Sequence, residues 1–140
     1  FLVQFGQEFD KLTSLPKVVN VELASNQISV YTDTLFCANP DNGEIYEIGK
    51  FRIEIFTDGR KGRDSIHWFN LTRQVSDYHA PHVDDEGRAC LGNMSEVIPE
   101  LIANYEYSVV AMLAIQFIES YNPDSPYCKI GNWPLAKRSK

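Results

Sequence analysis

The spacing of apolar residues predicts a helix and then a hairpin in the first quarter of the chain. Between residues 2 and 12 an apolar side chain recurs every three or four positions, which is typical of one buried stripe on a short helix. The helix is expected from Leu2 to Ser14, because Pro16 cannot continue it. β-Branched runs at residues 18–23 and 28–31 then flank a polar turn, which predicts the two strands of a hairpin.

Two further strands are predicted between residues 50 and 72. "KFRIEIF" (residues 50–56) alternates strictly between apolar and polar side chains, as a half-buried strand does, and "SIHWFNLT" (residues 65–72) is expected to be the next strand. "ANPDNGEIYEIG" (residues 38–49) contains Asn-Pro and Asn-Gly, and "DGRKGRD" (residues 58–64) is basic and contains glycine, so both are expected to be turns or loops. Consecutive strands joined in this way predict an antiparallel meander.

A long loop is predicted after the last strand. Residues 75–93 follow neither a helical nor a strand period, and Pro81 and Gly87 interrupt any regular element. Ordered loops of this length on a rigid scaffold often hold functional residues.

A buried helix and a basic tail are predicted to complete the chain. Between residues 109 and 118 only Gln116 is polar, which favours a buried helix. The helix is expected to end before "NPDSP" (residues 122–126), because a residue that precedes proline is pushed out of the helical region. The basic tail "LAKRSK" (residues 135–140) is expected to fray. Strands in succession with helices packed on them predict an α+β domain.

Composition narrows the class of protein. The 140 residues suffice for one domain with a core, and 44% hydrophobic with 23% charged residues is ordinary for a globular protein. A formal net charge of -6 disfavours nucleic acid as a partner. No apolar run reaches the roughly 18 residues of a membrane span. Three cysteines without a CxxC pair predict a reducing, cytoplasmic compartment.

The candidate chemistry lies in "YHAPHVDDEGRACLGN" (residues 78–93), for which three interpretations are open. The first is a buried structural thiol at Cys90, since free cysteine is among the most buried residue types. The second is a zinc site. Its ligands would be His79, His82 and Cys90 with Asp84 or Asp85.

The third interpretation is a nucleophilic Cys90. A thiolate is intrinsically a good nucleophile. Gly87 and Gly92 flank the cysteine, so that the backbone could approach a substrate closely. A polar side chain at position 82, across the loop, could donate a hydrogen bond to a developing oxyanion.

The stretch "APHVDDEGRACLGN" (residues 80–93) and the later "NPDSP" box (residues 122–126) resemble the ubiquitin-conjugating (E2) family. That family has His-Pro-Asn, a short acidic or polar turn, a glycine, two residues, the catalytic cysteine and a leucine. An apolar crossover helix that ends in Asn-Pro-Asp-Asp-Pro comes later. The positions in register here are Pro81, Gly87, Cys90 and Leu91.

The resemblance covers most of the chain and implies a UBC-like fold: an N-terminal helix, a four-stranded antiparallel meander, an active-site loop and a buried crossover helix. Residues 1–134 would form a single E2-like domain, followed by the basic tail at 135–140. The chain departs from the family in having Ala80 at the histidine position and His82 at the asparagine position. The "YPFxPP" element is absent, with residues 58–64 in its place, and the C-terminal helices are reduced or absent. These features are most similar to compact bacterial E2-like proteins.

The resemblance also implies a reaction and its partners. Cys90 would accept a ubiquitin-like protein as a thioester from an E1/ThiF-like activating enzyme and pass it to an amine, with no cofactor. Partners in the similar bacterial systems often include a JAB-type peptidase. His82 is the expected helper: it could support the oxyanion or accept a proton. The alternative is that His82 only anchors the loop by bonding a backbone carbonyl.

Further residues are expected at the rim of this site. They are Ser125, Asp124 and Asn93. Ser125 falls where the family has an acidic or serine residue that helps position the incoming amine, whereas His79 is expected to be structural. Two other functions stay open: an E2-like domain that has lost catalysis and serves as a binding module or scaffold, and an unrelated cysteine hydrolase. A hydrolase would need an acid to orient its histidine, and the sequence offers no clear candidate.

Overall fold

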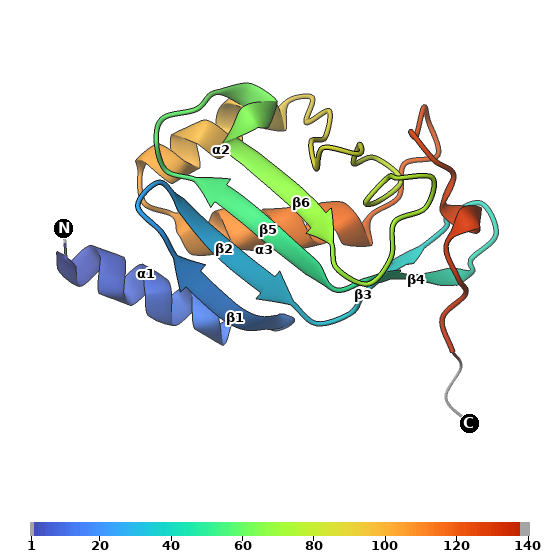
Figure 1. Ribbon diagram of the computed structural model, residues 1–140, viewed down its shortest axis with the longest axis horizontal. Coiled ribbons are helices and arrows are strands. Elements are labelled where there is room, and N and C mark those ends of the chain that lie inside the picture. The colour runs from blue at the N-terminus through green and yellow to red at the C-terminus, as the bar shows by residue number, and fades with distance from the viewer. Residues whose placement is uncertain (1, 138–140) are drawn as a thin grey trace.

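A four-stranded antiparallel sheet forms the centre of the protein. The structure is a computed structural model that describes residues 2–137, with side chains described from residue 6 onward. The strands lie in the order β1-β2-β5-β6, and every neighbouring pair is antiparallel (Figure 1). Their bounds are Val18–Leu23 for β1, Gln27–Thr32 for β2, Phe51–Phe56 for β5 and Ile66–Asn70 for β6. The predicted hairpin and the two predicted later strands are therefore present, and they form the expected meander.

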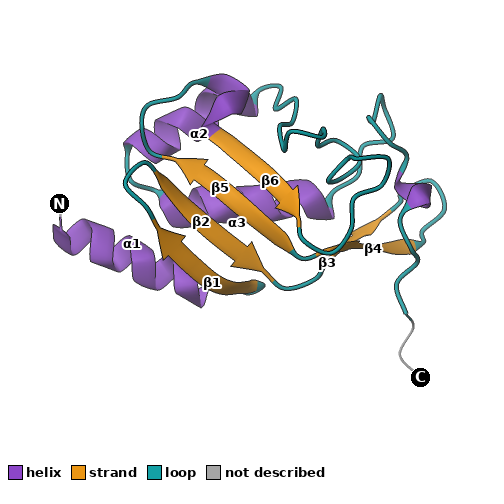
Figure 2. Ribbon diagram, viewed as in Figure 1, coloured by secondary structure: helices purple, strands orange, loops and turns teal. Residues whose placement is uncertain are grey.

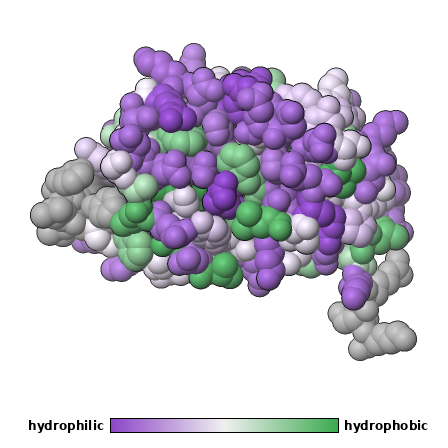
Figure 3. All heavy atoms as spheres, viewed as in Figure 1, coloured by the Kyte–Doolittle hydropathy of each residue, from purple (hydrophilic) through white to green (hydrophobic). Residues whose placement is uncertain are grey.

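Alternation of apolar and polar residues gives this sheet one buried face. Val30 of β2 pairs with Ile53 of β5, which pairs with Trp68 of β6, and each of the three is at most 1% exposed. The opposite face carries side chains such as Arg52 and Glu54, and it is mostly hydrophilic (Figure 3). Burial of one large apolar side chain contributes about 1.5–3 kcal/mol, so rows of this kind hold the strands in register.

A separate two-stranded ribbon was not predicted. Along the chain, β3 (Leu35–Ala38) and β4 (Ile45–Gly49) come between β2 and β5, and they pair antiparallel with each other. The sequence analysis expected only a turn at residues 38–49. The Asn-Pro and Asn-Gly dipeptides do form a turn, with the Gly43 amide donating to the Asn39 carbonyl at 2.8 Å. That turn is only the tip of the hairpin, and the strands on either side were too short to register as a pattern.

The chain beyond residue 133 extends this ribbon. The Glu47 amide donates to the Pro134 carbonyl and the Ala136 amide to the Ile45 carbonyl, both at 2.8 Å, so that Leu135 pairs with Tyr46. The prediction of a frayed tail from residue 135 is thus wrong for the part that the structure describes. The reason is that β4 offers a free edge whose backbone groups need partners.

Helices α1 (Leu2–Ser14) and α3 (Tyr107–Glu119) lie where the sequence predicted helices. α3 crosses behind the four-stranded sheet (Figure 1), and the indole Nε1 of Trp68 donates to the carbonyl of Ala114 at 3.1 Å. One face of α3 is buried, whereas Met112 and Gln116 are exposed. The predicted buried helix is therefore buried on one side only.

A third α-helix was missed. α2 (Met94–Ala103) follows the long loop and leads into α3 (Figure 2). It contains Pro99, which is unfavourable inside a helix, but burial of Ile98 and Ile102 on one face outweighs that cost. Two short 3-10 turns complete the fold, η1 (Gly62–Ser65) before β6 and η2 (Ile130–Asn132) after α3.

Within residues 120–137 the helical structure is limited to η2. None of the helices in the described part of the chain is long and apolar enough to cross a bilayer.

Candidate functional site

The loop at residues 75–93 has a defined path although it contains no helix or strand. Isolated backbone bridges join Ala80 to Val83 and Val83 to Ala89, and all three side chains are at most 2% exposed. Small and branched apolar residues thus pin the loop to the core. The loop is ordered by burial together with isolated hydrogen bonds, without a continuous helix or strand ladder.

A tight turn at residues 84–88 precedes the cysteine. Asp84 Oδ1 accepts the backbone N–H groups of Glu86 and Arg88, each at 2.9 Å, and the Asp84 N–H donates to the Arg88 carbonyl at 2.8 Å. The Gly87 carbonyl accepts the N–H of Trp68 in β6 at 2.8 Å. The first acid of the acidic run therefore builds the turn, and the turn is fastened to the edge of the sheet.

Cys90 is exposed, with its neighbour Ala89 fully buried. Leu91 is half-buried and packs against the core, so the residues on both sides of the cysteine fix its backbone. Cys37 shows the opposite environment: burial, with a smaller contribution from Glu119, raises the pKa of that thiol to about 11. The interpretation of Cys90 as a buried structural thiol is wrong, and it describes Cys37 instead.

His82 joins the loop to the segment that follows α3. Its Nε2 lies 2.6 Å from the carbonyl oxygen of Asn122, and because a carbonyl can only accept, Nε2 is the donor. The ring also lies against Tyr121, with centroids 6.0 Å apart. This is the loop-anchoring contact that the sequence analysis weighed against a chemical role; the chemical role stays a prediction.

His82 and Cys90 occupy corresponding positions on the two sides of the loop. The antiparallel bridge between Val83 and Ala89 makes residues 82 and 90 the next positions in that register. The residue expected to assist Cys90 therefore lies on the segment of the loop that faces residues 89 and 90.

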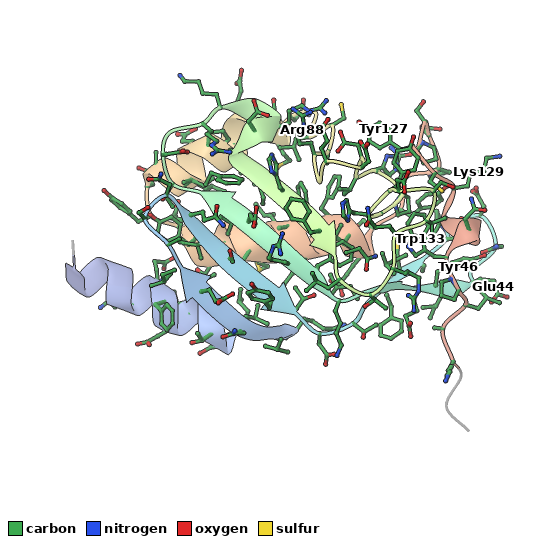
Figure 4. The ribbon with its side chains drawn as sticks, viewed as in Figure 1. Glu44, Tyr46, Arg88, Tyr127, Lys129 and Trp133 are labelled. Carbon is green, nitrogen blue, oxygen red and sulfur yellow. The ribbon has the colours of Figure 1, made fainter. Side chains whose placement is uncertain are left out.

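Further contacts reinforce the link to the C-terminal segment. The Pro81 carbonyl accepts the N–H of Tyr127 at 2.8 Å and of Cys128 at 3.3 Å. The rings of Tyr78 and Tyr127 stack, with centroids 5.8 Å apart and planes within 8°. Residues 78–82 are thus held against residues 121–128. In Figure 4, Tyr127 lies near the C-terminal segment and Arg88 lies to its left.

The expected rim residues are all exposed. Ser125 has a left-handed backbone with φ of 50°, and the Asp124 N–H donates to the side chain of Asn122 at 2.9 Å. Asn93 is the N-cap of α2. Among the described residues, none of the three expected rim side chains hydrogen-bonds to Cys90 or His82, so their part in the site stays a prediction.

His79 is buried and serves the structure of the loop. Its Nδ1 accepts the backbone N–H of Asn70 at 2.9 Å, and its Nε2 lies 3.3 Å from the side-chain nitrogen of Gln74. Burial lowers the pKa of His79. With His79 turned to Asn70 and His82 turned to Asn122, the two do not converge, and residues 6–137 contain no group of three or more His, Cys, Asp or Glu side chains placed to hold a metal ion.

Two arginines that sequence reasoning did not single out link the turn before Cys90 to η1. Arg63 of η1 pairs with Asp84 at 3.1 Å, and Arg88 pairs with Asp64 at 3.5 Å. The sequence shows mixed charges at residues 58–64 and 84–88, but nothing in their spacing indicates which charges meet.

Comparison with protein-family models gives no matching family for this chain, and comparisons with curated proteins and with solved structures give no match. The fold and the site by themselves describe the protein as an α+β domain that presents one exposed cysteine, Cys90, on an anchored loop.

Proposed function

We propose that the protein is an E2-like conjugating enzyme with a UBC-like fold. Cys90 accepts the C-terminal carboxyl of a ubiquitin-like protein from an E1/ThiF-like enzyme and transfers it to an amine. The observation that carries the proposal is the exposed thiol of Cys90 on a loop that His82 and Pro81 fasten to residues 121–128. The two stretches on which the E2 resemblance rests are thereby in contact.

The fold supports the proposal at the level of topology. An N-terminal helix, a four-stranded meander and a helix crossing one face of the sheet occur in the order that a UBC-like fold requires. The β3–β4 ribbon and α2 are additions to that plan, and both lie between elements without breaking the sheet order.

The reaction that we propose has two exchanges at one carbonyl carbon. The Cys90 thiolate attacks the thioester of the activating enzyme, a new sulfur–carbon bond forms, and the enzyme's cysteine leaves as a thiolate. An amine nitrogen then attacks the Cys90 thioester, loses one proton, and releases the Cys90 thiolate with formation of an amide. Because the first exchange is nearly balanced, the protein's task is positioning and stabilisation of the oxyanion.

The test uses the purified chain with ATP, the ubiquitin-like protein and the activating enzyme, which we expect to be encoded nearby. We expect an adduct that reductant removes from the wild-type protein, an ester that survives reductant in Cys90→Ser, and no adduct in Cys90→Ala. Cys128→Ser is the matched control and should load normally. A stable complex without any adduct would instead establish the second candidate, a binding module or scaffold.

The role of His82 can be separated into anchoring and proton transfer. Glutamine offers an N–H donor but cannot take up a proton at neutral pH, whereas alanine offers neither. We expect His82→Ala to slow discharge to free lysine by about tenfold or more and His82→Gln to keep most of the rate, because the observed contact is a donated hydrogen bond. Equal losses in both variants would point to proton transfer, and no loss in either would remove His82 from the site.

A further inference from the structure

The turn before Cys90 is linked to η1 by two ion pairs that run side by side. Arg63 Nη2 lies 3.1 Å from Asp84 Oδ2, and Arg88 Nη1 lies 3.5 Å from Asp64 Oδ1. Residues 63 and 64 are consecutive, and they meet the first and last residues of the 84–88 turn. Each side of the link contributes one acid and one base.

The two ion pairs differ in how they bear on the turn. The Asp84 side chain is only 15% exposed, and its Oδ1 already accepts the Glu86 and Arg88 amides, so the Arg63 contact to Oδ2 sets the plane of a carboxylate that shapes the backbone. Asp64 is 60% exposed and makes no such backbone contact. Arg88 belongs to the turn itself and also pairs with Glu86 at 2.9 Å, so Arg63 is the arginine outside the turn that contacts its Asp84 carboxylate.

The position of the turn determines where the thiol lies. Cys90 comes two residues after Arg88, and Ala89 between them is fully buried, so a rotation of the turn cannot be absorbed by a flexible linker. On the other side the chain enters α2 at Met94, whose amide donates to the Leu91 carbonyl at 3.0 Å. The cysteine is thus held between a charged clamp and the start of a helix.

We propose that Arg63 is a positioning residue for Cys90: it holds the Asp84 carboxylate in the orientation that aligns the 84–88 turn and so places the thiol for acyl transfer. This inference rests on the proposed function for its effect on reaction rate, but the clamp itself can be tested without any partner. Ion pairs this exposed contribute little to global stability, so the effect of Arg63 is local.

The partner-free test is amide hydrogen exchange at Glu86 and Arg88. In Arg63→Ala these two amides should exchange about fivefold faster, the factor that corresponds to loss of a partly exposed ion pair, with the β-sheet amides unchanged. Arg63→Lys should restore protection. Arg60→Ala is the matched control, because Arg60 contacts Phe56 and Asp58 and not the turn. Unchanged exchange at both amides in Arg63→Ala overturns the clamp.

The functional test follows discharge of the loaded protein to free lysine. We expect Arg63→Ala to lower kcat by up to about fivefold with KM for lysine unchanged, and Asp84→Asn to behave alike, since asparagine keeps an Oδ1 acceptor and loses the charge. The double variant should be no slower than either single variant. Normal kcat in Arg63→Ala overturns the positioning role, whereas a wild-type protein that never loads overturns the proposed function and leaves the exchange result to decide the clamp.

Discussion

At the scale of single residues, the three cysteines differ in how far their side chains are exposed. Cys90 is exposed and Cys37 is buried. Cys128 is half-buried, and its sulfur lies 3.6 Å from the side-chain Nδ2 of Asn132. Exposure and thiolate character together decide which cysteine reacts. The sequence singles out Cys90 by the motif around it, but only tertiary packing shows which of the three thiols is exposed.

Alkylation should follow this order. With iodoacetamide at pH 8 we expect Cys90 to be modified first, Cys128 more slowly, and Cys37 only after unfolding, because burial raises the pKa of Cys37 to about 11 and excludes the reagent. Peptide mapping by mass spectrometry at successive times measures the order. Cys90→Ser should abolish the fast phase, and early modification of Cys37 would contradict the described core.

Gly87 is the residue of the 75–93 loop whose replacement should be most costly. Its φ is +83°, and a Cβ there would lie 2.9 Å from both the Trp68 carbonyl oxygen and a ring carbon of Phe69. We expect Gly87→Ala to lower the free energy of unfolding by about 1–3 kcal/mol, measured by urea denaturation. Gly43→Ala is the control: its φ is +70° but nothing lies within 4 Å, so it should cost about 1 kcal/mol or less. Equal losses would show that the close contact at Gly87 relaxes.

At the scale of elements, a buried carboxylate joins α1 to α3. Glu8 is 7% exposed, and its Oε1 accepts both the backbone N–H and the hydroxyl of Ser108 in the first turn of α3, at 3.2 and 3.0 Å. Lys11 lies 3.1 Å from its other oxygen. A side chain of one helix thus caps the N-terminus of another, where negative charge is favoured.

Removing this cap should destabilise the fold. We expect Glu8→Ala to lower the free energy of unfolding by about 1–3 kcal/mol, since the Ser108 groups would stay buried without a partner, and Glu8→Gln to cost less because its amide oxygen can still accept. Asp10→Ala, at an exposed position of the same helix, should be near neutral. Urea denaturation of the three variants provides the comparison, and a neutral Glu8→Ala would contradict the cap.

The cap also predicts a dependence on acid. Burial raises the pKa of Glu8, but hydrogen bonds from Ser108 and the interaction with Lys11 outweigh burial and hold the pKa below its ordinary value. The stabilisation is therefore complete above the ordinary value for glutamate and is lost as the pH falls through the lower folded value. The loss should be absent in Glu8→Gln.

The elements that the sequence predicted correctly are those whose pattern of apolar residues is visible within a short stretch of the chain. α1, the four strands of the large sheet and α3 have apolar patterns that a window of five to thirteen residues displays. α2 was missed because Pro99 breaks the helical pattern, and β3 with β4 because turn dipeptides dominate a short hairpin. In each missed case burial against distant residues, and not local preference, stabilises the element.

At the scale of the whole molecule, two half-buried or buried histidines make stability depend on pH near neutrality. Burial lowers the pKa of His67, the charges of Arg60 and Arg88 lower it further, and Glu54 opposes them. Burial likewise lowers the pKa of His79. The unfolded chain therefore binds more protons than the folded chain just below the ordinary histidine value of 6.5.

Stability should accordingly be full above about pH 6.5 and decline as the pH falls below it, before carboxylates such as Glu8 begin to titrate. Urea denaturation at intervals from pH 8 to pH 5 measures the slope. His67→Gln should reduce the slope in this range, since one of the two contributing groups is gone. A stability that is flat or rises between pH 6.5 and pH 5.5 would contradict the burial of these rings.

The sequence by itself determined the α+β class and the order of α1, the four strands of the large sheet and α3, because these depend on apolar periods along the chain. It also singled out the stretch that contains Cys90 as the candidate site, because that choice depends on neighbouring residues in the sequence. It left open whether Cys90 is buried and which groups His82 and Asp84 contact, and it wrongly predicted a frayed tail where residues 134–136 pair with β4. Those outcomes depend on contacts between residues 21 to 91 positions apart: His82 with Asn122, Arg63 with Asp84, and β4 with residues 134–136. Such contacts have no local signature, since they are decided only when the whole core packs and each buried polar group must find a partner.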